Sequence, residues 1–409
     1  MTPCRTFPSH IERAPCPGWY IENYSRFFMK PSDKGPSMPR QNIPLGKIFG
    51  IPIGLDYSWF LIFVLMTWSL STTYYPAQFH GWPPFRYWIL GGITSVLFFS
   101  SILLHELGHS VVALQYKIPV RSITLFIFGG VAQIAEEPPS ALSEFLIAIA
   151  GPLVSLSLGA TFLGLKTLFS GFDPLLGLCR YLSFINFAIV GFNLIPGYPL
   201  DGGRVFRAIV WAITKNMRRS TIIASTAGQF FGFGFIFIGV WMMLHGNFGS
   251  GLWLSVIGWF LGNAAAAQIQ QVTFQGWLGT YKVSQAMNRS CAIVPEGLSL
   301  RKLVEDQILV KGQRCFIVGE EADPRGLVTL HQIREVGQPD WDKTTVRQTM
   351  IPIDNLRTIH PDDPLWSAFR MMDREGVNQL PVMSNGHVVG ILTREDVITF
   401  LGTLKELGT

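Results

Sequence analysis

The stretch Ser101–Ser110 reads Ser-Ile-Leu-Leu-His-Glu-Leu-Gly-His-Ser and contains the pattern His-Glu-x-x-His at His105, Glu106 and His109. Residues four apart lie on one face of an α-helix, so both imidazoles can reach one metal ion. Glu106 lies on the same turn, where its carboxylate can accept a proton from an attacking water. The pattern therefore predicts a metal site with an adjacent proton acceptor.

The setting of this motif is apolar. The eighteen residues Tyr87–Leu104 contain no Asp, Glu, Lys or Arg, so the motif lies near the end of a helix long enough to enter a membrane. Ionisable groups at membrane depth are costly and by default mark a functional site. Alternatively, His105 and Glu106 are helix-end residues that reach the interface and pair with each other, but that leaves His109 unexplained.

The composition indicates a membrane protein with several spans. Of 409 residues, 48% are hydrophobic and only 14% are charged, against roughly 25% charged in an average soluble domain. The net charge is +5, but no dense Lys/Arg run with interleaved aromatic residues occurs, which argues against nucleic-acid binding. Five cysteines without a Cys-x-x-Cys pair argue against a disulfide framework and against a cysteine zinc site.

The hydrophobic segments predict a membrane α-helical bundle of about six transmembrane helices. The expected spans are Tyr57–Thr73, Tyr87–Leu114, Ala141–Phe169, Leu175–Ile195, and two within Ser220–Tyr281 divided at His245–Gly251. Gly151-Pro152 is expected to kink the third span. Two segments, Gly46–Leu55 and Pro119–Ile134, instead have the pattern of strands, which predicts a short membrane-associated β region.

The distribution of cations predicts the orientation of the bundle. Ten fall on one side of a six-span arrangement: Arg40, Lys47, Lys117, Arg121, Arg204, Arg207, Lys215, Arg218, Arg219 and Lys282. Arg86 and Arg180 fall on the other side, with Lys166 near that end. The positive-inside rule then predicts that both termini and the soluble C-terminal region are cytoplasmic.

The chain from Lys282 onward has the mixed charge of a soluble sequence and contains an internal repeat. Val283–Met287 corresponds to Val346–Met350, Cys315–Val318 to Leu380–Met383, and Gly326–Leu330 to Gly390–Arg394. Each copy is expected to run as strand, helix, strand, strand, helix over about sixty residues, which predicts a soluble α/β domain with two similar halves.

A third metal ligand is needed, because catalytic zinc usually takes three protein ligands and keeps one position open. Asp201 is the candidate: it follows a Pro-rich break and precedes Gly202-Gly203. Considered alone, Asp201 could equally be a cap for a helix starting near Gly202. Its combination with the histidine motif on a neighbouring span favours the ligand interpretation.

At this point the sequence resembles the site-2 protease family of intramembrane zinc metalloproteases (peptidase family M50). The resemblance covers roughly Gly46–Gln271 and rests on His-Glu-Leu-Gly-His at 105–109 together with Asn193-x-x-Pro-x-x-x-x-Asp201-Gly. It implies one zinc ion per chain held by His105, His109 and Asp201, with Glu106 as the catalytic residue. It also implies that the Phe128-Gly129-Gly130 region lies near bound substrate and that Asn193 lies near the site, where it helps to polarise the scissile carbonyl.

The C-terminal repeat resembles a tandem pair of CBS domains, which implies an adenine nucleotide (ATP, ADP or AMP) as ligand. The family's Thr/Ser-x-x-Asp contact occurs in the second copy at Thr393 and Asp396, while the first copy has Thr329 and Gln332 instead. Alternatively, the pair only forms a homodimer or docks on the membrane domain.

The sequence therefore predicts regulated proteolysis of transmembrane protein substrates within the lipid bilayer, gated by nucleotide at the CBS pair. The alternatives are a CBS-regulated divalent metal transporter and a proteolytically inactive scaffold. The expected division is a tail at 1–45, a membrane metalloprotease domain at 46–275, and CBS domains at 280–338 and 343–405. Residues 1–37 are expected to be a disordered tail or the product of a misassigned start codon, with Met38 as the initiator.

Overall fold

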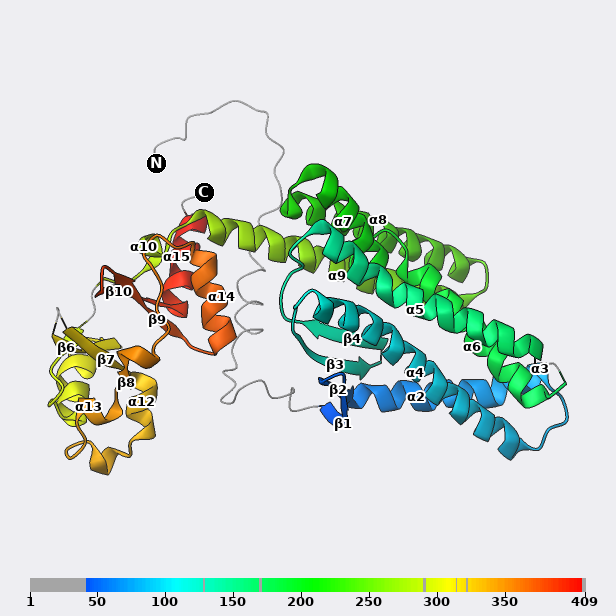
Figure 1. Cartoon of the computed structure of the whole chain (residues 1–409), viewed down its shortest axis with the longest axis horizontal. Helices are drawn as coiled ribbons and strands as arrows, with labels where there is room; N and C mark the ends of the chain where they lie inside the picture. Colours follow the sequence, from blue (N-terminus) through cyan, green and yellow to red (C-terminus); the bar gives the residue numbers. More distant parts are fainter. Residues whose placement is uncertain are drawn as a thin grey trace, which may run out of the picture.

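The computed structural model describes residues 42–127, 129–168, 171–289, 292–313, 315–320 and 323–406. Figure 1 shows two lobes: one of long helices with a small sheet, and one α/β lobe formed by the C-terminal part of the chain. Residues 1–37, for which the sequence predicts a tail or a misassigned start, lie outside the described residues, as do Cys4, Cys16 and Cys291.

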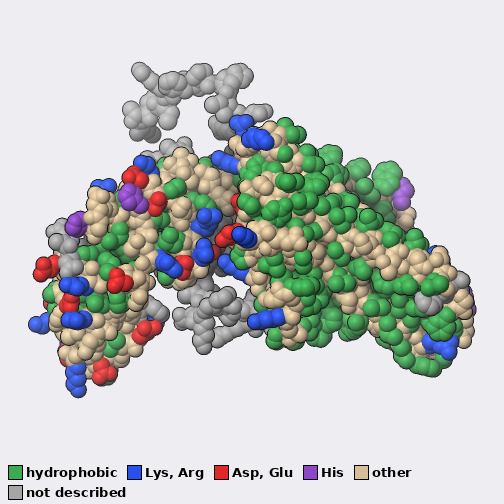
Figure 2. Space-filling model, viewed as in Figure 1, with side chains coloured by type: hydrophobic (Ala, Val, Ile, Leu, Met, Phe, Trp, Pro, Cys, Tyr) green, Lys and Arg blue, Asp and Glu red, His purple; other side chains and the backbone are tan. Residues whose placement is uncertain are grey.

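Five of the described helices are long and apolar enough to cross a membrane, which confirms five of the expected spans. They are α4 (Pro84–Gln115), α5 (Ala141–Leu168), α6 (Asp173–Asn193), α8 (Met217–Leu244) and α9 (Phe248–Thr280). The division between α8 and α9 falls where predicted, at a turn in which Gly246 takes a φ of +91°. Figure 2 shows hydrophobic side chains covering the helical lobe, as lipid contact requires.

The first expected span is helical from Tyr57 to Gln78 but consists of three pieces. These are α2 (Tyr57–Ser69), a π-helical turn η1 (Leu70–Tyr74) and α3 (Tyr75–Gln78). Pro76 lacks an N–H and cannot bond to the carbonyl of Thr72, which accounts for the local change of helix type. That this segment crosses the membrane stays a prediction.

Both segments expected to be strands form one four-stranded sheet in the order β1-β2-β3-β4. Its strands are β1 (Asn42–Ile48), β2 (Ile51–Asp56), β3 (Val120–Phe126) and β4 (Gly129–Ile134). The sheet lies beside α4 (Figure 1), where Leu107 packs in one buried cluster with Ile51 and Ile123. The sheet is therefore fixed to the helix face next to the histidine motif.

The α/β lobe contains both copies of the repeat. The first copy contributes β5 (Ala292–Val294), α11 (Leu300–Lys302), η2 (Leu303–Leu309), β6 (Cys315–Glu320), β7 (Asp323–Thr329), α12 (Leu330–Glu335) and η3 (Gln338–Asp340). The second contributes α14 (Leu365–Glu375), β9 (Gln379–Ser384), β10 (His387–Thr393) and α15 (Arg394–Glu406). The opening strand expected in the second copy is reduced to a single bridge between Ile359 and Val382.

The two copies exchange their opening segments. The remaining short elements of the lobe are α10 (Val283–Ala286), α13 (Val346–Thr349), β8 (Ile351–Pro352) and η4 (Ile353–Asn355). Val283 opens the first copy but is buried in the hydrophobic core of the second, and Val346 opens the second copy but is buried in the core of the first. Each copy therefore needs the other to complete its core.

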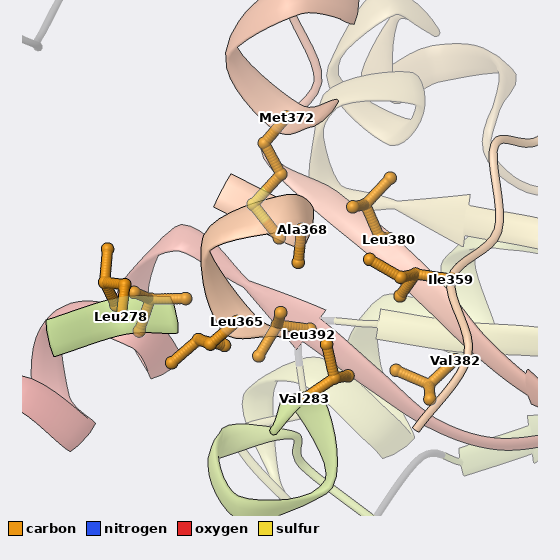
Figure 3. Close-up of a cluster of buried hydrophobic side chains, with 10 residues drawn as sticks. Leu278, Val283, Ile359, Leu365, Ala368, Met372, Leu380, Val382 and Leu392 are labelled. Atoms are coloured by element: carbon orange, nitrogen blue, oxygen red, sulfur yellow. The ribbon is translucent and has the colours of Figure 1, made fainter. Parts of the chain in front are cut away.

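The last turn of α9 also belongs to the core of the second copy. Leu278 is fully buried there with Leu365 and Leu392 (Figure 3). The Phe274 ring meets the Phe369 ring edge-on, with 6.0 Å between the ring centroids. One helix is thus both a candidate membrane span and part of the core of the soluble lobe.

Candidate metal centre

His105 and His109 come from consecutive turns of α4 and lie side by side in the helical lobe. Both side chains are buried, with exposed fractions of 4% and 3%. Their Nε2 atoms are 3.2 Å apart, as expected for residues four apart on one helix face. The motif thus brings its two imidazoles together in the geometry that the spacing predicts.

The neighbouring helix α5 orients both rings. His109 Nδ1 is 2.7 Å from the carbonyl oxygen of Ile147, and a carbonyl can only accept, so Nδ1 carries the proton. His109 Nε2 is therefore left with its lone pair. His105 Nδ1 is 2.9 Å from the hydroxyl oxygen of Ser155. Such partners on the far nitrogen fix the tautomer and orientation of metal-binding histidines.

Gly151 of α5 provides the space for the imidazoles. A Cβ atom at this position would lie 2.2 Å from His109 Nε2 and 2.7 Å from His105 Nε2. Any larger residue would therefore occupy the volume into which both Nε2 atoms point. The sequence predicts only a kink at Gly151-Pro152, whereas the structure gives Gly151 a direct place beside the site.

Asp201 reaches the same volume from a third element, α7 (Asp201–Thr214). Its Oδ2 atom lies 3.0 Å from His105 Nε2 and 3.2 Å from His109 Nε2. The N-cap position of α7 is occupied by Leu200, and no side chain caps it, so the interpretation of Asp201 as a helix cap is wrong.

Glycines hold the loop before α7 close to its neighbours. A Cβ at Gly202 would lie 2.4 Å from the carbonyl carbon of Leu194, and one at Gly203 would lie 2.3 Å from that of Gly197. The loop from the end of α6 therefore folds directly over the first turn of α7. This close approach accounts for the Gly202-Gly203 pair after Asp201.

The three donor atoms fit a divalent cation. Four-coordinate zinc with bonds of about 2.0–2.1 Å keeps its ligand atoms about 3.3 Å apart, close to the 3.0–3.2 Å observed among these three. A carboxylate oxygen and imidazole lone pairs are all acceptors and cannot satisfy one another without a proton or a cation. Within the described ranges, His105, His109 and Asp201 form a group that could hold a metal ion.

Glu106 lies between this cluster and the sheet. Its Oε2 atom accepts a hydrogen bond of 3.1 Å from the backbone N–H of Ala132 in β4. A Cβ at Gly130 would lie 2.6 Å from Glu106 Cγ, so β4 approaches α4 closely at this point. The structure thus brings Gly130 beside Glu106, while Phe128 lies outside the described residues.

Asn193 is the last residue of α6 and is half-buried. Among the residues that the structure describes, no hydrogen bond joins it to His105, His109 or Asp201. Four residues that contact the metal cluster or Glu106 were not identified as site residues from the sequence: Ile147, Gly151, Ser155 and Ala132. Two of them act through backbone groups, which no residue type reveals.

Thr393 and Asp396, the residues expected to contact nucleotide, hydrogen-bond to each other within four residues of the chain. Asp396 Oδ2 accepts from the Thr393 N–H at 2.9 Å and from its hydroxyl at 2.7 Å, and the Asp396 N–H donates back to Thr393 Oγ1 at 3.0 Å. This is a capping box at the start of α15. In the first copy, Gln332 Oε1 likewise accepts from the backbone N–H and the hydroxyl of Thr329.

Comparison with known proteins gives two family matches. The model of peptidase family M50 matches residues 93–179 and 166–239, and the CBS domain model matches residues 346–403. A Synechocystis protein provisionally named a zinc metalloprotease is 36% identical over 90% of this chain and 98% of its own length. Rip3 of Mycobacterium tuberculosis, also provisionally named a zinc metalloprotease, is 33% identical over 90% of this chain and 94% of its own length.

A solved structure is also similar to part of this chain. The site-2 protease from Methanocaldococcus jannaschii is 31% identical, with a TM-score of 0.41, and the match covers 56% of this chain and 95% of that one.

Proposed function

Because this chain belongs to the site-2 proteases of peptidase family M50 and carries a CBS domain, it is an intramembrane metalloprotease, and we propose how its residues perform the reaction. His105, His109 and Asp201 hold the zinc ion that the names of the relatives imply, and Glu106 transfers protons during peptide hydrolysis. The observation that carries this proposal is the convergence of three potential ligand atoms, two imidazole Nε2 and one carboxylate oxygen, within 3.2 Å of one another in a buried site.

Zinc bound by these residues would polarise the scissile carbonyl and make the attacking water more acidic. The protein positions the ligands and shapes the site. The Ile147 carbonyl and the Ser155 hydroxyl hold the imidazoles in position, and Gly151 leaves the space clear. Burial of the cluster excludes bulk water, which strengthens every electrostatic interaction inside it.

Glu106 is placed to act as general base and then as general acid. Its Oε2 is held by the Ala132 N–H, and its Oε1 has no hydrogen-bond partner in the described chain. The free oxygen can take a proton from the attacking water and return it to the leaving amine. The backbone of β4 thus orients the carboxylate.

The substrate is a transmembrane protein segment that must lose helical structure locally, since a helix shields its own carbonyls. We place the extended segment along β4, which within the described residues pairs only with β3 and lies at the edge of the sheet. An edge strand can accept one more strand through backbone hydrogen bonds. Gly129 leaves room for close approach, Gly130 keeps β4 against Glu106, and Asn193 would help to polarise the carbonyl from the end of α6.

Cation placement supports an orientation in which both termini and the CBS pair are cytoplasmic. We also retain the CBS domains at 280–338 and 343–405 and the end of the membrane domain at 275 as part of the proposal. The membrane domain starts at Asn42 and not at 46, because β1 begins there and pairs with β2, so the expected tail at 1–45 is too long. In this arrangement the metal site lies toward the cytoplasmic end of α4.

We propose further that adenine nucleotide at the CBS pair regulates cleavage, with Thr393 and Asp396 among the contacts. The physical route is α9, since Leu278 and Phe274 pack in the core of the second copy. A change in that core would move or release the end of a membrane helix. Equal cleavage with and without ATP or AMP, at concentrations shown to saturate binding, would exclude this regulation.

The test of the proposed reaction uses the full chain in proteoliposomes with tagged single-span membrane proteins. The wild type is compared with Glu106→Gln, and Glu136→Gln serves as a matched control because Glu136 is exposed and lies outside the site. A fragment cut within the span with the wild type and the control, but not with Glu106→Gln, supports the proposal. Cleavage retained in Glu106→Gln would refute the role of Glu106.

A further inference from the structure

A buried ion pair lies in the helical lobe apart from the metal cluster. Glu144 of α5 is fully buried, and Arg207 of α7 is 4% exposed. Arg207 Nε donates to Glu144 Oε1 at 2.6 Å, and Nη2 donates to the same oxygen. Glu144 Oε2 has no partner in the described chain, so this carboxylate is held by Arg207 alone.

The guanidinium of Arg207 also contacts two other parts of the lobe. Nη1 lies 3.4 Å from Thr221 Oγ1 on α8. The Arg207 Cζ lies 5.3 Å from the centroid of the Tyr198 ring, in the loop that leads into Asp201. Arg207 therefore joins α5, α8 and the loop before α7 at one point.

The two helices that this pair connects are the ones that complete the metal cluster. α5 carries Glu144 and, on its following turns, the Ile147 carbonyl and Ser155 hydroxyl that orient the histidines. α7 carries Arg207 and begins with Asp201. The distance from Asp201 to the histidines thus depends on how α7 is docked against α5.

The pair is costly to maintain as a simple packing element. Two charges removed from water are repaid only by good geometry, and well-packed apolar residues of similar volume often stabilise as much. Here the two carboxylate oxygens are used unequally. Nε and Nη2 of Arg207 both contact Glu144 Oε1, and Glu144 Oε2 has no partner in the described chain. A role in fixing the direction and depth of α7 accounts for this arrangement.

We propose that Glu144 and Arg207 are positioning residues that hold α7 against α5 and thereby keep Asp201 at ligand distance from His105 and His109. This inference rests on the proposed metal site. It makes metal affinity, and not only folding, depend on a pair that touches none of the three ligands.

The experiment measures Co²⁺ binding to the detergent-purified full chain, by competition with a chelator and by the visible absorption bands of bound Co²⁺. Variants are Glu144→Gln, Arg207→Gln and Arg207→Lys, with Arg219→Gln as control for an exposed arginine of α8. Loss of partners behind metal ligands typically lowers metal affinity by about ten- to a hundredfold. We expect such a loss and altered absorption bands in both Gln variants, a smaller loss in Arg207→Lys, and none in the control.

A double variant, Glu144→Gln with Arg207→Gln, removes the pair without leaving a buried charge, so it keeps the test valid if either single variant fails to fold. Thermal unfolding of the metal-free proteins measures the purely structural effect separately. Wild-type affinity and absorption bands in the double variant, or in either folded single variant, would overturn the proposal. Wild-type binding by Asp201→Asn would instead refute the metal site itself, so the two failures are distinguishable.

Discussion

The metal cluster and the Thr393–Asp396 pair were both identified as short motifs, but they differ in how their polar atoms are satisfied. His105, His109 and Asp201 come from two helices and direct three potential ligand atoms at one volume. Thr393 and Asp396 lie on one helix start and make three hydrogen bonds to each other in a capping box. The cluster gathers its atoms around a volume that a cation can occupy, whereas the capping box uses its atoms to start a helix.

The first CBS copy has Gln332 at the position of Asp396, and the same contrast applies to it. Gln332 replaces the carboxylate there and still accepts from the backbone N–H and hydroxyl of Thr329. The local fold therefore tolerates either side chain, so helix capping alone accounts for both. A difference between the copies in nucleotide binding would have to come from contacts to the ligand itself.

The largest expected effect comes from removing the ligand contributed by α7. Asp201→Asn replaces a charged ligand with a neutral amide, so we expect both bound zinc and cleavage to be lost. Metal analysis of the purified chain and the cleavage assay check this result. Asp173→Asn, an exposed carboxylate at the start of α6, is the matched control. Zinc retained at wild-type stoichiometry in Asp201→Asn would contradict the assignment.

Glu106→Gln separates metal binding from chemistry. The amide cannot accept the proton, so we expect the cleavage rate to fall by about 10²–10⁴ while zinc stays bound. Single-turnover cleavage with saturating enzyme measures this loss without interference from product release. If zinc disappeared together with activity, Glu106 would be part of the metal site instead of the proton acceptor.

Gly151→Ala places a methyl group where both imidazole Nε2 atoms point. The added Cβ must displace a histidine ring, so we expect metal affinity to fall by at least about tenfold. Competition with a chelator measures the affinity. Gly164→Ala on the same helix meets no atom within 4 Å and should leave affinity unchanged. An equal result for the two variants would show that Gly151 does not shape the site.

Leu278→Ala tests the connection between the two regions. Truncating a fully buried leucine should destabilise the second CBS core by about 2–5 kcal/mol, measured by thermal or denaturant unfolding of the full chain. We also expect any nucleotide dependence of cleavage to weaken, because the end of α9 loses its anchor. Leu252→Ala, an exposed apolar position on the same helix, is the control. Unchanged stability would contradict the placement of Leu278 in that core.

The smallest expected effect comes from the capping boxes. Asp396→Ala and Gln332→Ala should each destabilise the CBS pair by about 1 kcal/mol, since each removes a helix-capping contact. Neither should change metal affinity. Under our proposal only Asp396→Ala also weakens binding of AMP or ATP, which equilibrium dialysis can measure. Identical nucleotide binding by both variants and the wild type would leave Thr393–Asp396 with a structural role alone.

Much of the helical lobe and its cluster could be predicted because long apolar runs and the i, i+4 spacing of His105 and His109 report local geometry directly. Asp201 could be found since few carboxylates occur in the membrane half. The contribution of α5 could not be predicted in the same way. Helical periodicity does not say which face of α5 meets α4. The contact from Ile147 is made by its backbone carbonyl, which every residue type has, so the sequence gives no sign of it.

Two further features depended on tertiary packing. Glu144 and Arg207 are far apart in the sequence, and Arg207 was expected only as one cation among ten on the cytoplasmic side. The CBS repeat was visible as sequence similarity, but similarity cannot show that Val283 and Val346 are each buried in the core of the opposite copy. In both cases the partner is set by how elements pack, which the local pattern does not record.

The most direct test of the central claim is X-ray absorption at the zinc edge on the Glu106→Gln chain, which should retain zinc without cutting substrate. The account predicts two imidazole nitrogens among nitrogen and oxygen scatterers at about 2.0–2.1 Å, with no sulfur, and loss of one imidazole in the His109→Ala form. A sulfur scatterer, or an unchanged spectrum after His109→Ala, would contradict the assignment of His105, His109 and Asp201.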